Sequence, residues 1–116
     1  MSDDVLVTVP RDPLFGLTAE EYVEKIKKML TGRVHAAYIF GSFTGDNFSK
    51  FSDIDLILVC DTSLPFVERT REFMDVPDLV PSTDVLVYTP DEFTSLMDAP
   101  AVGFWKSVKE SMVRIV

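Results

Sequence analysis

The chain has 116 residues, a length that suits one domain with one hydrophobic core. It is 47% hydrophobic and 11% aromatic, which excludes a disordered chain. Its net charge is −8, from 11 basic and 19 acidic residues, and this argues against long nucleic acids as ligands, because phosphate binding needs a basic surface. No apolar run approaches the roughly 18 residues of a membrane span.

The N-terminal segment, residues 1–17, is expected to be an arm or an edge strand followed by a loop. It contains the apolar run "VLVTV" and then Pro10 and Pro13, which interrupt regular structure. Its first residues are acidic where a secretory signal would be basic, so we expect a soluble, cytoplasmic protein without a membrane partner. Cys60, the single cysteine, permits no internal disulfide. Residues 18–116 are expected to form the domain.

The first predicted helix spans 18–32. Thr18 and Glu21 stand at the spacing of a capping box, and Gly32 is a natural helix stop. One face of this helix is apolar, and it comprises Tyr22, Val23, Ile26, Met29 and Leu30.

Strands and helices alternate in the rest of the chain. Strands are predicted over 34–40, 53–59 and 83–88, with a short closing strand over 112–116. Helices are predicted over 65–74, from the Thr89 cap onward and from 103 to the closing strand, and Ser42 begins a helix or turn after the first strand. The strand over 53–59 is apolar on both faces beyond Asp55 and should be central. This order predicts an α/β (α+β) fold, a small mixed sheet flanked by helices.

Two carboxylates, Asp53 and Asp55, open the central strand. Side chains of a strand alternate between its faces, so these two point the same way, with Cα atoms about 6.5 to 7 Å apart. Two carboxylates this close together raise each other's pKa unless a cation lies between them. A hard divalent cation such as Mg²⁺ takes oxygen ligands and keeps positions open for phosphate oxygens.

A third carboxylate and a small-residue turn complete the pattern. Asp84 begins the next strand and reaches the same pocket if the two strands are neighbours, and three carboxylates can hold two metal ions. Gly41 permits close approach of the backbone to a ligand, and Ser42 can begin a turn whose amides bind phosphate. Taken singly, Gly-Ser is a common strand exit, and Asp-x-Asp suits a polar strand edge or the metal site of a longer glycosyltransferase.

As a set, these residues resemble the nucleotidyltransferase domain of the DNA polymerase β superfamily. The matching residues are Gly41, Ser42, Ser52, Asp53, Ile54, Asp55, Leu56 and Asp84. Within the superfamily, the sequence is most similar to the minimal nucleotidyltransferases (MNT), small domains often encoded beside a helical HEPN protein. The resemblance covers roughly residues 18–116 and includes the segments "DVLVYTPDEF" and "GFWKSVKE".

The resemblance implies a role for each matching residue. Gly41, Ser42 and Ser52 would bind the triphosphate of a nucleotide, and Asp53, Asp55 and Asp84 would ligate two Mg²⁺ ions, with Asp84 also acting as general base. The implied reaction transfers a nucleoside monophosphate, AMP from ATP, to a hydroxyl of a protein or small molecule. The implied partner is a helical HEPN-type protein or a second copy of the chain.

The loop after Gly-Ser departs from the family pattern. Many members continue as G-S-R-A-R-G, whereas this chain has Phe43 and Gly45 at the basic positions and Asp46 where the later glycine is usual. Lys50, a basic residue later in the same segment, could replace the missing basic residues in binding the nucleotide.

Two functional hypotheses remain open from the sequence. One is the enzyme described above; the other is a non-catalytic module, an antitoxin that works by binding its partner. The small size of the chain motivates the binding hypothesis, because a partner or another copy of the chain would have to supply the acceptor. Outside the motif, His35 is expected to be structural or exposed, and Phe104 and Trp105 are expected to lie in the core or at an interface.

Overall fold

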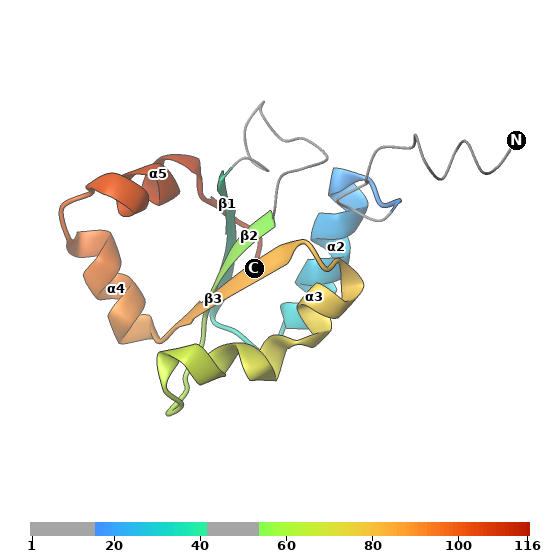
Figure 1. Ribbon diagram of the computed structural model, residues 1–116, viewed down its shortest axis with the longest axis horizontal. Coiled ribbons are helices and arrows are strands. Elements are labelled where there is room, and N and C mark those ends of the chain that lie inside the picture. Colours follow the sequence, from blue (N-terminus) through green and yellow to red (C-terminus); the bar gives the residue numbers. More distant parts are fainter. Residues whose placement is uncertain (1–15, 42–53) are drawn as a thin grey trace, which may run out of the picture.

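The computed structural model describes residues 16–41 and 54–116, in which helices and strands follow the predicted order except between β2 and β3, where there are two helical elements instead of one (Figure 1). The elements are α2 (Ala19–Leu30), β1 (Ala36–Phe40), β2 (Ile54–Val59), η2 (Phe66–Phe73), α3 (Asp75–Leu79), β3 (Thr83–Tyr88), α4 (Pro90–Asp98), α5 (Gly103–Ser111) and β4 (Val113–Arg114). The predicted arm, 1–17, lies outside the described residues except at Gly16 and Leu17. Within the two described segments, no helix has the length and apolarity needed to cross a membrane.

The four described strands form one mixed sheet in the order β3-β2-β1-β4. Strand β1 runs antiparallel to both β2 and β4, whereas β2 and β3 are parallel. The central position predicted for the strand after Asp53 is confirmed, because β2 is hydrogen-bonded on both sides and buries nearly every residue. A strand buried on both faces is apolar throughout, which explains its sequence.

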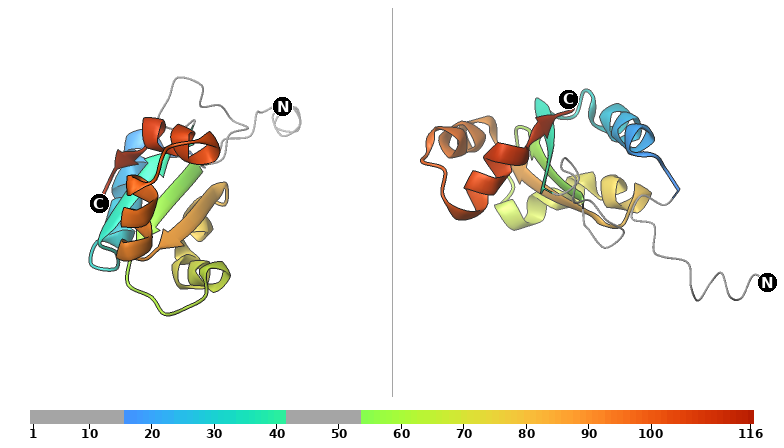
Figure 2. Two further views of the ribbon diagram at one scale, coloured as in Figure 1. Left: turned by 90° about the vertical axis from the view of Figure 1, so that its left-hand side faces the viewer. Right: turned by 90° about the horizontal axis from the view of Figure 1, so that it is seen from above.

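Helices cover both faces of this sheet (Figures 1 and 2). On one face, α2, η2 and α3 pack against the sheet around a core that includes Tyr22, Ile26, Leu30, Ile39, Leu56, Leu58, Phe73 and Val76. On the other, α4 and α5 pack around a smaller core that includes Phe40, Ile57, Val59, Val108 and, partly buried, Trp105. The predicted fold class, a small mixed sheet flanked by helices, is confirmed.

The predicted capping box at Thr18 is present, and the predicted cap Thr89 forms a second box. The Thr18 backbone N–H donates to Glu21 Oε1 at 2.8 Å, and the Glu21 N–H donates to Thr18 Oγ1 at 3.0 Å. Thr89 and Glu92 make the same pair of bonds at the start of α4, where Pro90 takes the first helical position. Each box satisfies two backbone amides that lack a partner within the helix, and so fixes where the helix begins.

The segment predicted as one helix over 65–74 is different in the structure. Pro65 precedes a 3-10 helix, η2, and a separate short α-helix, α3, follows after Met74. Pro77 explains the break, because it has no N–H to donate to the carbonyl four residues earlier, at Phe73. It is tolerated in the first turn of α3, where that bond would be missing in any case.

The closing strand is also shorter than the predicted 112–116. Met112 caps α5, and β4 comprises only Val113–Arg114. The last residues still follow β1, since the N–H of Ile115 donates to the Ala37 carbonyl at 2.8 Å.

Candidate active site

Two carboxylates from neighbouring strands lie side by side at one end of the sheet. In the parallel pairing of β2 with β3, Asp55 is directly opposite Asp84, so their Cα atoms are separated by one strand spacing, about 4.8 Å. Asp55 is half-buried and Asp84 is exposed. The prediction that these two strands are neighbours, on which the role of Asp84 depended, is confirmed.

The face that carries these carboxylates follows from alternation along the strands. Leu56 packs in the core beneath α2, so Asp55 lies on the opposite face, where α4 and α5 cover the sheet. Phe40 of β1 is the other neighbour of Asp55, which gives a row of Phe40, Asp55 and Asp84 across three strands. The row places two anionic groups beside one aromatic ring.

Gly41, directly after β1, is packed against this row. Its φ is +83°, and a Cβ atom at this position would lie 2.9 Å from Asp55 Oδ2. Both the backbone conformation and the close approach therefore favour glycine. The structure shows close approach of Gly41 to the Asp55 carboxylate, and the predicted close approach of Gly41 to a ligand stays a prediction.

A serine at the end of α5 holds Gly41. The Gly41 N–H donates to Ser111 Oγ at 2.9 Å, and the Ser111 hydroxyl donates to the Ser107 carbonyl at 2.9 Å. Helix α5 thereby reaches the start of the predicted phosphate-binding loop. Sequence reasoning missed Ser111, because nothing local indicates a bond between residues 70 positions apart.

A pocket of about 380 Å³ opens over the carboxylates, which is within the range of small-ligand sites. Its lining comprises Phe40, Asp55, Asp84, Val85, Leu86 and Phe104. Phe104 of α5 meets Phe40 edge to face, with ring centroids 5.9 Å apart. Of the two positions expected for Phe104, the core is wrong, since it lines this pocket and is 57% exposed, and a place at an interface stays a prediction.

The other predicted site residues, Ser42, Lys50, Ser52 and Asp53, lie outside the described residues, and so does the loop between them. Within 16–41 and 54–116, no three potential metal-ligating side chains form a group. The two carboxylates described there suit a hard cation by their chemistry: both offer oxygen ligands, both lie on one face, and the pocket leaves room for phosphate oxygens. Asp55 and Asp84 therefore fit Mg²⁺.

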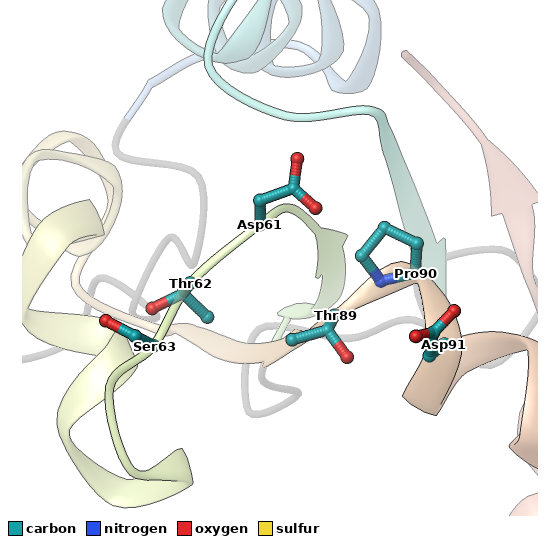
Figure 3. Close-up of a pocket in the computed structure, with 6 residues that line it drawn as sticks. All are labelled: Asp61, Thr62, Ser63, Thr89, Pro90 and Asp91. Carbon is teal, nitrogen blue, oxygen red and sulfur yellow. The ribbon is translucent and has the colours of Figure 1, made fainter.

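Figure 3 shows a larger pocket, of about 650 Å³, at the opposite ends of β2 and β3. It is lined by Asp61, Thr62, Ser63, Thr89, Pro90 and Asp91. Thr89 and Asp61 already have partners within the fold: Thr89 caps α4, and Asp61 Oδ2 lies 2.8 Å from Nε2 of the exposed His35. Size alone would favour this pocket, but the paired carboxylates lie in the smaller one.

Comparison with known proteins finds one family model, which matches most of the chain, including residues of both pockets. The family model "Polymerase beta, Nucleotidyltransferase" matches residues 24–101, a span that includes Gly41, Asp55 and Asp84. The chain belongs to this family. The resemblance drawn from the motif is thus confirmed, and the paired carboxylates lie within a nucleotidyltransferase domain.

Solved structures share the fold of this nucleotidyltransferase. One is the complex of the Shewanella oneidensis tri-AMPylated HEPN toxin with its MNT antitoxin, with 19% identity and a TM-score of 0.51 over 85% of this chain and 72% of the other. Another is a toxin–antitoxin structure with AMP-PNP, with 21% identity and a TM-score of 0.54 over 81% of this chain and 72% of the other. Among curated proteins, no relative matches the chain.

Proposed function

We propose that this nucleotidyltransferase transfers AMP from ATP to a hydroxyl group of a protein or small molecule and releases pyrophosphate. The observation that carries the proposal is the register of β2 and β3, which sets Asp55 against Asp84 in a pocket of ligand size. Carboxylates from two strands on one face suit phosphoryl chemistry, because catalysis there depends on positioning and on electrostatic stabilisation.

In this proposal, Asp53, Asp55 and Asp84 hold two Mg²⁺ ions. When bound, such ions neutralise phosphate charge and stabilise the attacking and leaving oxygens. Gly41, Ser42, Ser52 and Lys50 bind the nucleotide.

Asp84 has a second role in the proposal. Its carboxylate is exposed, so an acceptor hydroxyl can approach within hydrogen-bonding distance, and it accepts the hydroxyl proton as general base. Asp55 is half-buried beside Gly41, so we assign it to metal binding and assign proton transfer to the more exposed Asp84.

We further propose that the acceptor belongs to a helical HEPN-type partner, for which this chain acts as antitoxin. One solved structure that shares its fold is a tri-AMPylated HEPN toxin in complex with an MNT antitoxin. An antitoxin that only binds its partner is the second candidate, and it is favoured by the loop at 43–46, which lacks the basic residues common in the family.

The test uses the isosteric variants Asp55→Asn and Asp84→Asn, with Asp98→Asn as the matched control. Asp98 is an exposed aspartate at the end of α4, away from the pocket. Transfer of labelled AMP from ATP to the co-purified partner is measured with Mg²⁺ and after chelation. We expect both site variants to lose transfer, Asp84→Asn by about 10²–10⁴-fold because it lacks the general base, and the control to retain it.

Transfer at the original rate by both site variants would contradict the catalytic proposal. If the variants cannot transfer AMP but still bind and neutralise the partner, the second candidate accounts for neutralisation. Titration calorimetry with ATP and Mg²⁺ on the unaltered chain measures nucleotide binding separately from transfer.

A further inference from the structure

Phe104 is a large aromatic side chain left exposed beside the catalytic pocket. It is the second residue of α5 and is 57% exposed, whereas Phe40 behind it is only 5% exposed. A single exposed aromatic ring is common on protein surfaces. Phe104 differs because its ring forms part of the pocket wall next to Asp55 and Asp84.

The orientation of the Phe104 ring is set by the fold. It packs edge to face against Phe40, at an interplanar angle of 87°, and against Trp105, at 84° with centroids 5.4 Å apart. Trp105 in turn packs against Tyr88 of β3. A ring held by aromatic neighbours loses little conformational freedom when a ligand binds, which favours affinity.

Helix α5 itself is anchored to the rest of the domain. Val108 is buried in the core of this face, and Lys109 Nζ donates to the carbonyls of Met97 and Ala99, at 3.0 and 2.7 Å, at the end of α4. Ser111 joins the far end of α5 to Gly41. These contacts fix the position of α5, which carries Phe104, relative to α4 and to Gly41 beside Asp55.

The pocket lining combines two kinds of chemistry, and a nucleotide has the same two. The carboxylates of Asp55 and Asp84 suit metal-bound phosphates, and the Phe104 ring with the other apolar lining side chains suits a base. We propose that the exposed face of Phe104 is the surface on which the nucleobase of the bound nucleoside triphosphate stacks. The inference rests on the proposed function and extends it to substrate specificity.

The chemistry of the lining predicts how selective this surface is. Apart from the two carboxylates, the described lining residues are Phe40, Val85, Leu86 and Phe104, none of which has a side-chain amide or hydroxyl to read the edge of a base. Stacking without edge contacts depends on ring area and tolerates different bases. A stack on Phe104 should therefore favour the larger purine rings of ATP and GTP over the pyrimidine rings of CTP and UTP.

The experiment compares ATP with inorganic tripolyphosphate, which has the phosphates but no base. Both are titrated, with Mg²⁺, into the unaltered protein and into Phe104→Ala and Phe104→Trp; Val102→Ala, a change at an exposed neighbour, is the control. Phe104→Ala should bind ATP about 5- to 150-fold more weakly, the effect of losing one base–aromatic stack, and tripolyphosphate with unchanged affinity. Phe104→Trp should retain ATP affinity.

Several outcomes would overturn the inference. Equal weakening of ATP and tripolyphosphate would show that Phe104 only supports the carboxylates, and unchanged ATP affinity with weaker transfer would assign Phe104 to the acceptor. Failure of the unaltered protein to bind either ligand would instead contradict the proposed function itself. Far-UV circular dichroism confirms that each variant is folded.

Discussion

Gly41 illustrates how a single residue serves both the fold and the site. Its left-handed backbone conformation carries a steric cost for other residues, and the space where a side chain would begin is occupied by the Asp55 carboxylate. Gly32, which follows the C-cap of α2, has a similar φ of +86° but no atom within 4 Å of the added Cβ position. A comparison of the two positions therefore separates the cost of backbone strain from the effect of crowding at the Asp55 carboxylate.

Gly41→Ala and Gly32→Ala should destabilise the domain to a similar degree, roughly 1–2 kcal/mol, because both force a side chain into the left-handed region. Only Gly41→Ala should also weaken binding of ATP with Mg²⁺, because the Asp55 carboxylate must move away from the new methyl group. Urea denaturation and titration calorimetry measure the two effects. Equal loss of nucleotide affinity in both variants would show that crowding at Asp55 does not matter.

Among the elements, η2 and α4 are joined by one buried arginine. Arg69 Nη1 donates to Glu92 Oε1 at 2.6 Å and to the Val87 carbonyl at 3.2 Å, and Arg69 Nε donates to the Leu64 carbonyl at 2.9 Å. Glu92 also closes the capping box of α4. The same carboxylate thus sets the start of α4 and neutralises a charge buried beneath it.

Because of this arrangement, the stability of the fold should vary with pH in the acidic range. The Arg69 side-chain hydrogen bond, followed by the Thr89 amide, lowers the pKa of Glu92 from 4.5 to about 2. The unfolded chain has the higher pKa, so the contribution of Glu92 is present above about pH 4.5 and is lost as the pH falls toward 2. Because the Glu92 side chain is 45% exposed, solvent screening keeps the effect modest.

Glu92→Gln should therefore be less stable than the unaltered chain at neutral pH, and the difference should shrink between pH 4.5 and pH 2. Thermal unfolding followed across this range provides the measurement. Glu68→Gln is the control, since Glu68 pairs with the exposed Arg71 at 3.3 Å, and surface pairs contribute about 0–1 kcal/mol. A stability difference that does not vary with pH would rule out the proposed linkage.

The elements show which structural features a sequence pattern can predict. The capping boxes at Thr18 and Thr89 were predictable because both partners lie within three residues. The division of 65–79 into η2 and α3 was not predicted, although Pro77 is a local signal for it. The burial of Arg69 depends on Val87 and Glu92, which are distant in sequence, so no local pattern indicates it.

At the scale of the whole molecule, the sheet separates two cores. Leu56 and Ile57 are adjacent and fully buried, but Leu56 packs beneath α2 and Ile57 beneath α5. The chain has one tryptophan, Trp105, and it lies on the α5 face. Its fluorescence therefore reports on one core, while far-UV circular dichroism reports on both.

Leu56→Ala should lower the free energy of unfolding by about 2–5 kcal/mol, because it removes a fully buried side chain from the α2 core. If the domain unfolds as one cooperative unit, the urea midpoints from Trp105 fluorescence and from circular dichroism should shift together. Val67→Ala, at a side chain 82% exposed, should shift neither. A Trp105 midpoint unaffected by Leu56→Ala would show that the two faces unfold independently.

The site was only partly predictable from the sequence, for physical reasons. Asp55 and Asp84 could be paired because each opens an apolar strand, and the parallel register confirms that they are opposite each other. The contacts of α5 with the site could not be predicted, because Phe104 and Ser111 lie on a helix whose docking depends on the whole sheet.

The parallel register of β2 and β3 also has a consequence for how this protein can diverge. The segment between these strands, residues 60–82, can gain or lose residues in its turns without moving either carboxylate. A slip of β3 by one residue would instead place Thr83 or Val85 opposite Asp55 and turn the Asp84 side chain to the other face. Over evolutionary time, then, insertions and deletions should accumulate in the connection, while the two strands tolerate substitutions but not changes in length.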